Sequence, residues 1–198
     1  MSRVDFAEQL DLLKQALPDV AIEQVPSVDQ LAILVPAASI ADVARTLRTH
    51  PSLQYQVLAE LTGVDVWPVE PRFEVVYHFV ALGVHAFGDP QAAPPARLRV
   101  KVRVPGDAAV VPTICEIYPN ANWYEREVYD LFGVWFSDHP DPRRILMPED
   151  WEGHPARKDY PVQVKLPVDA GMPLQVTEEE FVQNIAQQRG TAPKGRPS

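Results

Sequence analysis

Residues 97–104 read RLRVKVRV, and this stretch decides the fold class. Leucine and valine occupy every second position, with arginine or lysine between them, which is the two-residue period of a β-strand with one buried face. The apolar runs at 31–35 (LAILV) and 72–82 (RFEVVYHFVAL) predict two further strands. The cationic positions of 97–104 indicate a solvated outer face of the sheet, with a docking patch as the alternative.

Helical patterns surround these strands. Residues 5–17 carry apolar side chains on one stripe, and a second helix is expected after Ser39, a residue type that suits a helix N-cap. Asn122 and Glu125 resemble a capping box for a third helix that ends at Gly133.

Two segments have weaker patterns. Residues 53–67 are ambiguous and are interpreted as a short helix that runs into a strand at 64–67. Pro112 is expected to open a helical turn that continues through Ile117. Taken together, residues 1–135 predict an α+β domain in which helices pack on one mixed sheet of about four or five strands.

Proline dominates the chain after residue 136. Seven prolines between positions 140 and 173 exclude a helix or a central strand, whereas apolar side chains such as Trp151 need a surface to cover them. We therefore expect an extended subunit-binding strap over residues 136–176 that orders only on a partner. A terminal helix beginning at Thr177 and a disordered tail are expected within 177–198.

Composition excludes several classes of protein. A net charge of −9 argues against nucleic-acid binding, and no apolar run is long enough to cross a membrane. The single cysteine, Cys115, excludes an intrachain disulfide or an iron–sulfur cluster held by this chain alone, and the absence of any GxG sequence removes the dinucleotide fingerprint. The N-terminus lacks a signal-peptide pattern, so a cytoplasm-like compartment is expected.

Acidic residues on the predicted third helix are the first candidates for chemistry. Glu125, Glu127 and Asp130 could act as acid–base groups, but no nucleophile or phosphate cradle lies near them in the sequence. Structural ion pairing is the favoured interpretation. Arg126 is placed to pair with Asp130 one turn away, and Glu125 is expected to pair with an arginine of the 143–144 pair.

A metal site is the second candidate. Asp138, His139 and Asp141 lie close together on a loop, but loops combine such residues often by chance. His139 is therefore expected to bond to the backbone of a turn.

The same region carries a recognisable signature. ERE at 125–127, YDLFG at 129–133, HP at 139–140, RRIL at 143–146 and RKDYP at 157–161 occur in this order. The region resembles the 30-kDa subunit family of respiratory complex I.

The resemblance implies a role in an assembly. The family's members are cofactor-free structural subunits of the peripheral arm of a proton-translocating NADH–quinone oxidoreductase. They lie beside the 49-kDa-type quinone-site subunit and neighbouring iron–sulfur subunits. FMN and the clusters then belong to partner subunits, and the chain is peripheral on the cytoplasmic side of the bacterial membrane. No catalytic residue is expected in this chain, which would belong to an enzyme only as a subunit. Folding and contacts between subunits are the implied roles of the motif positions Glu125, Arg126, Glu127, Asp130, His139, Arg143, Arg144, Asp159 and Tyr160.

Two alternatives stay open. One is the equivalent subunit of a membrane-bound hydrogenase or of a ferredoxin-fed quinone reductase. The more distant one is a free-standing metal-dependent hydrolase that uses Asp138, His139 and Asp141.

Overall fold

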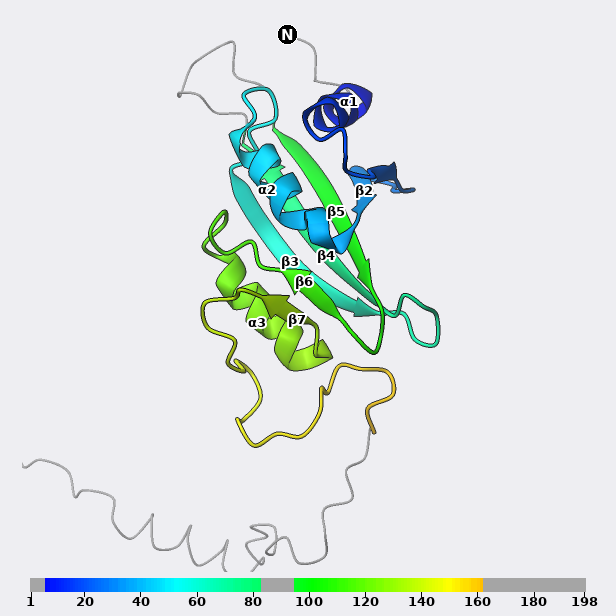
Figure 1. The fold of residues 1–198 in the computed structure, drawn as a ribbon, viewed down its shortest axis with the longest axis vertical. Coiled ribbons are helices and arrows are strands. Elements are labelled where there is room, and N and C mark those ends of the chain that lie inside the picture. Colours follow the sequence, from blue (N-terminus) through cyan, green and yellow to red (C-terminus); the bar gives the residue numbers. More distant parts are fainter. Residues whose placement is uncertain (1–5, 83–94, 162–198) are drawn as a thin grey trace, which may run out of the picture. The chain divides into compact units, whose positions relative to one another are not determined.

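A computed structural model describes residues 6–82 and 95–161. They form a five-stranded sheet in the order β1-β2-β5-β4-β3, and a separate pair of strands, β6 and β7 (Figure 1). The β2–β5 pair is parallel and the other pairs of the large sheet are antiparallel, so the mixed sheet and the α+β class predicted from the sequence are confirmed. The elements are α1 (Phe6–Ala16), β1 (Glu23–Gln24), β2 (Leu31–Val35), a 3₁₀ turn (Ala37–Ser39), α2 (Ile40–Thr49), β3 (Val57–Asp65), β4 (Phe73–Ala81), β5 (Ala96–Val104), β6 (Val110–Pro112), α3 (Ala121–Phe132) and β7 (Trp135–Ser137).

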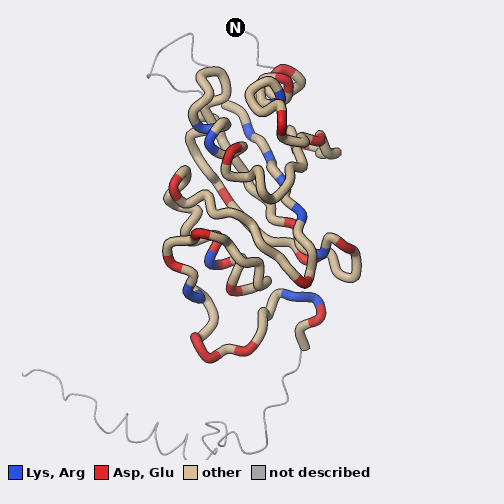
Figure 2. The backbone as a smooth tube through the Cα atoms, in the orientation of Figure 1, with Lys and Arg blue, Asp and Glu red and all other residues tan. Residues whose placement is uncertain are grey.

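The alternation of β5 separates the two faces of the sheet. Leu98, Val100, Val102 and Val104 are buried in the core, which is the outcome that the two-residue period predicts. On the other face, the Lys101 Nζ donates to Glu74 of β4 at 2.6 Å, and the Arg103 Nε donates to the same carboxylate at 3.1 Å. Two of the cations seen along β5 in Figure 2 therefore have a partner within the sheet.

Helix α2 covers the apolar face, with α1 beside it (Figure 1). Its buried residues Ile40, Val43, Ala44 and Leu47 are those of the predicted stripe. Ser39 occupies the N-cap position, but its side chain makes no capping bond because the 3₁₀ turn before α2 places it in helical conformation. The α-helices of the described part are 10 to 12 residues long, and none is long and apolar enough to cross a membrane.

Strand β3 corrects one prediction. The expected short helix within residues 53–63 is wrong, because β3 pairs with β4 from Val57↔Val80 to Asp65↔Phe73. Long-range pairing and burial override the weak local preference of this segment. A register shift between Leu58 and Glu60 marks a β-bulge in the strand.

The outer edge of β3 is covered by side chains from the segment before α3 and from its first turn. The Tyr118 hydroxyl donates to the Tyr55 carbonyl at 2.6 Å, and the Asn120 Nδ2 donates to the Leu58 carbonyl at 2.7 Å. The Tyr124 hydroxyl donates to the carbonyl of Ala59, within the bulge, at 3.1 Å. Carbonyl groups at the start of this edge strand, which would otherwise be open to pairing, are thus occupied.

The N-cap of helix α3 lies two residues earlier than predicted. Asn120, not Asn122, precedes the helix, and Glu125 does not close a capping box because its carboxylate lies in the interior. Gly133 ends the helix in the left-handed region at φ 76°, as predicted. The helix also packs closely on β3, where a Cβ at Gly63 would lie 2.7 Å from the Phe132 ring.

The expected helical turn opened by Pro112 is also wrong. Val110–Pro112 pair in parallel with Trp135–Ser137 as β6 and β7, a long-range contact that local sequence does not reveal. The turn comes later, where the amides of Ile117 and Tyr118 donate to the Ile114 carbonyl.

Residues 138–161 have no helix or strand, which agrees with the proline spacing. They nevertheless bond to α3 and to the sheet within one compact unit that continues through Tyr160. We expected the α+β domain to end at residue 135 and the following segment to order only on a partner, but residues 138–160 pack on their own domain. The rest of the proposed strap to residue 176, and the helix and tail of 177–198, lie outside the described residues.

Candidate functional site

Asp130 is the centre of the motif region. It lies on α3 and is fully buried, and its Oδ2 accepts from three successive backbone amides, those of Ile145, Leu146 and Met147, at 3.0, 2.7 and 2.8 Å. Its Oδ1 accepts from the Arg144 Nη1 at 2.6 Å. Burial acts to raise the pKa of Asp130, but these hydrogen bonds outweigh it and hold the pKa below its usual value. The carboxylate therefore fixes the RRIL stretch onto α3.

Arg126 and Arg144 extend this attachment. Arg126 does not pair with Asp130, as the helical spacing predicted; its Nε and Nη2 donate to the carbonyls of Arg143 and Arg144 at 2.9 and 3.0 Å. Arg144 also donates from Nη2 to the Gly153 carbonyl at 3.0 Å. Two arginines thus bridge the helix and the irregular segment mainly through backbone oxygens, which periodicity arguments do not detect.

A second attachment joins the RKDYP motif to the sheet through Arg72. Its guanidinium donates to Asp65 at 2.8 and 3.0 Å and to Asp159 at 2.6 and 2.9 Å, while the Lys158 amide donates to Asp65 at 2.9 Å. Burial acts to raise the pKa of Asp65, but the bonds from Arg72 and from the Lys158 amide hold it well below its usual value. The Arg157 Nε adds a bond to the Phe132 carbonyl at 2.5 Å.

Arg72 and Asp65 were not among the sequence candidates. The available signal was an arginine at the start of an apolar strand, which needs a carboxylate once it is buried. Tyr160 completes this end of the segment, since its hydroxyl donates to the Glu152 carbonyl at 3.2 Å and its ring stacks on Trp151.

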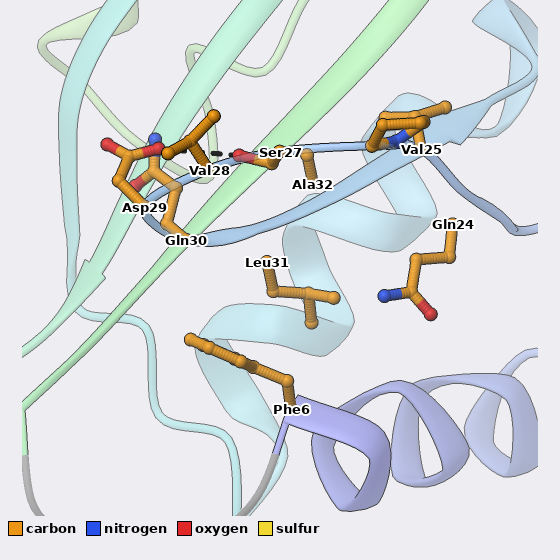
Figure 3. Close-up of a pocket in the computed structure, with 10 residues that line it drawn as sticks. Phe6, Gln24, Val25, Ser27, Val28, Asp29, Gln30, Leu31 and Ala32 are labelled. Atoms are coloured by element: carbon orange, nitrogen blue, oxygen red, sulfur yellow. Dashed lines mark hydrogen bonds between the residues drawn. The ribbon is translucent and has the colours of Figure 1, made fainter.

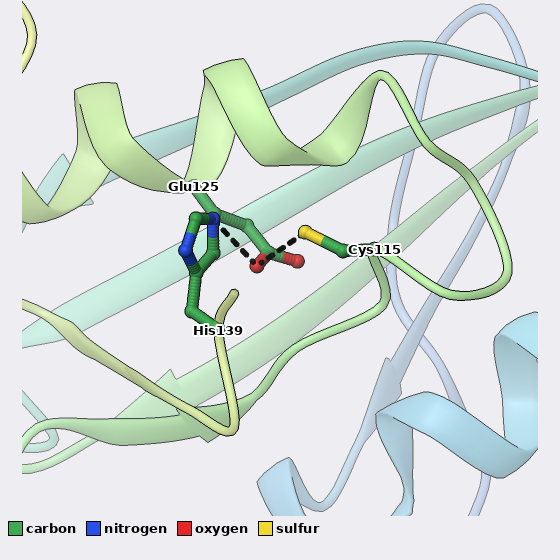
Figure 4. Close-up of side chains that lie close together, drawn as sticks. All are labelled: Cys115, Glu125 and His139. Carbon is green, nitrogen blue, oxygen red and sulfur yellow. Dashed lines mark hydrogen bonds and ion pairs between the residues drawn. The ribbon is translucent and has the colours of Figure 1, made fainter. Parts of the chain in front are cut away.

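Glu125 lies in a separate cluster with Cys115 and His139 (Figure 4). The predicted pairing of Glu125 with Arg143 or Arg144 is wrong. Its fully buried carboxyl instead accepts from the Ile114 amide at 2.9 Å, the Thr113 hydroxyl at 2.5 Å and the Cys115 thiol at 3.4 Å. Burial raises the pKa of Glu125, although these donors oppose the shift.

His139 bonds to backbone on both sides of its ring, including the turn contact that was expected. The Asp141 amide donates to Nδ1 at 3.0 Å, so the ring proton is on Nε2, which donates to the Asn122 carbonyl at 3.2 Å. Burial lowers the pKa of His139 and favours this neutral form.

The Cys115–Glu125–His139 cluster contains three ligand types that zinc accepts, with ligand atoms within 4.8 Å of one another. The hydrogen bonds do not fit that use, because the Nε2 that faces the cluster carries the ring proton. Burial also raises the pKa of the Cys115 thiol to about 12, which opposes the deprotonation that zinc ligation requires. The arrangement therefore forms a buried polar network.

The other metal candidate, Asp138 with His139 and Asp141, is not assembled either. Asp141 accepts from the Arg143 Nε and Nη2 at 2.6 and 2.8 Å, and the Arg126 guanidinium lies 3.5 Å away. Its charge is thus matched by arginine, while both nitrogens of His139 are occupied by backbone.

Glu127 has a different environment from the other motif carboxylates. It is exposed on α3, and no hydrogen bond or ion pair of its side chain occurs among the described residues. The ERE motif therefore combines an interior acid, a bridging arginine and a surface acid.

A pocket of about 450 Å³ lies at the turn between β1 and β2 (Figure 3). Phe6 lies on one side of it and residues 24–32 form the rest of its lining. None of the motif residues contributes to this pocket, so the signature and this cavity lie in different parts of the domain.

The sequence is similar to those of known proteins. A family model described as "Respiratory-chain NADH dehydrogenase, 30 Kd subunit" matches residues 33–165. A subunit of the NADH-quinone oxidoreductase of Roseiflexus sp. (strain RS-1) is 42% identical over 159 residues, which cover 80% of this chain and 86% of that protein. The corresponding protein from Roseiflexus castenholzii is 45% identical, with the same coverage.

Solved structures share the fold. A trypsin-resistant fragment of Nqo5 (1–134) superposes with a TM-score of 0.51 at 29% identity and covers 69% of this chain and 99% of the fragment. A chain of the membrane-bound sulfane sulfur reductase, an archaeal respiratory membrane complex, gives a TM-score of 0.62 at 24% identity, with 97% and 95% coverage, and supports the fold alone. The family model, which spans more than half of the chain, and relatives above 40% identity show that this chain belongs to the 30-kDa subunit family of the respiratory-chain NADH dehydrogenase.

Proposed function

We propose that this chain is a cofactor-free structural subunit of the peripheral arm of a proton-translocating NADH–quinone oxidoreductase. In this role it supports electron transfer from NADH to quinone by holding neighbouring subunits in place. The proposed neighbours are the 49-kDa-type quinone-site subunit and iron–sulfur subunits, with the arm on the cytoplasmic side of the membrane. The relatives that match most of its length carry the name of a subunit of this enzyme.

The observation that carries the proposal is the use of the signature residues within the chain. Asp130, Arg126, Arg144 and Asp159 all bond to other parts of the same chain, where they attach residues 138–160 to α3 and to the sheet. A catalytic group would instead need to reach a substrate or a cofactor. The signature thus favours the construction of a defined surface.

Redox chemistry is assigned to partner subunits. The chain has one cysteine, whereas an iron–sulfur cluster normally takes four thiolate ligands, so this chain alone cannot supply them. FMN and iron–sulfur clusters would be held by the neighbours, and the chain would associate with the membrane only through the complex.

A second candidate is the equivalent subunit of a related membrane-bound complex, such as a hydrogenase or a ferredoxin-fed quinone reductase. It is favoured by the fold that the chain shares with the membrane-bound sulfane sulfur reductase. The two candidates differ in the electron donor. Membranes of cells that lack this chain should lose NADH-driven quinone reduction under the first proposal, and hydrogen- or ferredoxin-driven reduction under the second.

The test of a structural role is complementation of such a deletion. Asp130→Asn should lower the amount of assembled complex on a native gel, while turnover per assembled complex stays at the wild-type value. Glu127→Gln, which alters a surface carboxylate on the same helix, is the matched control and should assemble normally. Full assembly of the Asp130 variant with slow turnover would contradict the proposal and indicate a direct part in the reaction.

A further inference from the structure

We propose that Trp135, Leu146, Asp150, Trp151 and Glu152 form a docking surface for a basic, partly apolar surface of a neighbouring subunit. This inference rests on the proposed function and adds which face of the chain meets its partner. These five residues make up the 135/146–152 surface.

Large apolar side chains are exposed on this surface. Leu146 is 55% exposed, Trp135 43% and Trp151 37%. Exposed tryptophans that gather on one surface are typical of binding interfaces, where tryptophan is enriched among the residues that dominate affinity.

Ring contacts connect β7 to the 151–154 turn, and Arg144 joins the stretch before Leu146 to Gly153 of the same turn at 3.0 Å. The Tyr129 ring lies edge-on to Trp135, at 5.5 Å between centroids, and also to His154, at 5.9 Å. Trp151 lies three residues before His154 and stacks on Tyr160 at 6.5 Å. The surface therefore continues from β7 across Tyr129 to the 151–154 turn.

The backbone under this surface is held in place before any partner binds. The Leu146 amide is bonded to the buried Asp130, the Gly153 carbonyl accepts from Arg144, and the Trp151 amide donates to the Pro148 carbonyl at 3.1 Å. A preorganised surface loses less conformational entropy on association than a mobile loop does. The bonds made by the family signature thus have a use beyond the fold of this chain.

Charge identifies the kind of partner. Asp150 and Glu152 flank Trp151 and are exposed, and neither has an ion pair among the residues that the structure describes. Two cations of the same segment are paired elsewhere, since Arg144 pairs with Asp130 and Arg143 with Asp141. A partner that presents lysine or arginine around an apolar depression would complement this surface.

A second copy of this chain is a poorer match. The chain carries a net charge of −9, so two copies repel one another. Its own exposed cation row on β5 is partly neutralised by Glu74. We therefore infer that a different subunit of the complex binds this surface.

Photocrosslinking in the assembled complex identifies the polypeptide that contacts this surface. A benzoylphenylalanine placed at Trp151 should crosslink to another subunit, at a peptide that contains lysine or arginine beside apolar residues. The same probe at Trp67, which is 49% exposed on the β3–β4 connection, is the matched control. A crosslink from position 151 to residues 162–198 of the same chain, to a second copy, or to no polypeptide would overturn the inference.

Substitutions test how much the 135/146–152 surface contributes to binding of the chain to the rest of the complex. Leu146→Ala with Trp151→Ala should reduce the chain recovered with the tagged complex by roughly tenfold or more, since truncation of interface tryptophans commonly has effects of this size. Asp150→Lys with Glu152→Lys should weaken recovery and reduce its sensitivity to salt. The charge variant should keep the wild-type unfolding transition, the Leu146 and Trp151 variant should still unfold cooperatively despite the lost Tyr160 stack, and Trp67→Ala should be recovered as wild type.

The outcomes separate this inference from the proposed function. If the wild-type chain does not copurify with the other subunits, the proposed function fails. If the wild type copurifies and both double variants do so equally well, the 135/146–152 surface is not the interface, while the structural role stands.

Discussion

Replacing Asp130 by asparagine should destabilise the folded chain by about 3–5 kcal/mol, the range expected when one partner of a buried ion pair is removed. The carboxylate is fully buried and accepts four hydrogen bonds, one from Arg144 and three from successive backbone amides. Each hydrogen bond to a charged group contributes about 1.5–3 kcal/mol, but these four share one acceptor group and do not add independently. Asparagine keeps one acceptor oxygen and directs an NH₂ group at donors.

Urea unfolding followed by tryptophan fluorescence measures this loss, and hydrogen exchange localises it. The amides of residues 145–147 should exchange slowly in the wild-type chain alone and quickly in the Asp130→Asn variant. Glu127→Gln, on the exposed side of the same helix, should change stability by less than about 0.5 kcal/mol. A loss below about 1 kcal/mol for Asp130→Asn, with residues 145–147 still protected, would refute the reasoning, because the carboxylate would then not hold the segment.

Three further predictions concern other buried groups. Arg72→Lys keeps the charge but loses the paired bonds to two carboxylates, so the free energy of unfolding should fall by about 1.5–3 kcal/mol. The urea midpoint should fall with it, and an unchanged midpoint would contradict this prediction. The pKa of Glu125 is raised from its ordinary 4.5 in the folded chain, so stability falls as pH rises from 4.5 towards the folded value. Glutamine does not titrate, so the Glu125→Gln variant should not lose stability in this way, and its free energy of unfolding relative to wild type should rise as pH increases across this interval. Urea titrations at several pH values measure this, and a difference in free energy that does not change with pH would contradict the raised pKa of Glu125. Burial raises the pKa of Cys115 to about 12, so at about pH 8 a thiol reagent should react on the order of 10³-fold more slowly with the folded than with the urea-unfolded chain, and equal rates would show a reactive thiol.

Periodic patterns predicted the parts of the fold that depend on one buried face. The alternation of residues 97–104 and the stripe from Ile40 to Leu47 correspond to observed elements because burial repeats along a strand or helix. Residues 53–63 were predicted wrongly because strand pairing with β4, and not local preference, decides their conformation. The β6–β7 pair was missed for the same reason.

The site was harder to predict than the fold. Glu125 and Asp130 were both selected as carboxylates that need partners, but Asp130 is held mainly by three backbone amides, and Glu125 by one amide and the side chains of Thr113 and Cys115, which no sequence pattern marks. For this reason the sequence argument underestimated the attachment of residues 138–160 to the domain. The prolines do exclude regular structure there, yet side chains from α3 and Arg72 supply the bonds that regular structure would have made.

The covered start of the β3 edge affects the solubility of the chain before it is assembled with other subunits. A subunit of a large complex exists for some time as a free molecule, and an unprotected sheet edge would recruit strands from other nascent chains into aggregates. Asn120 and Tyr124 occupy the carbonyls of Leu58 and Ala59 in β3, and Tyr118 occupies that of Tyr55 just before it, so strand addition is hindered at the start of this edge. Loss of these three donors should therefore appear first as a solubility defect in cells that make the protein in excess, even where the assembled complex remains active.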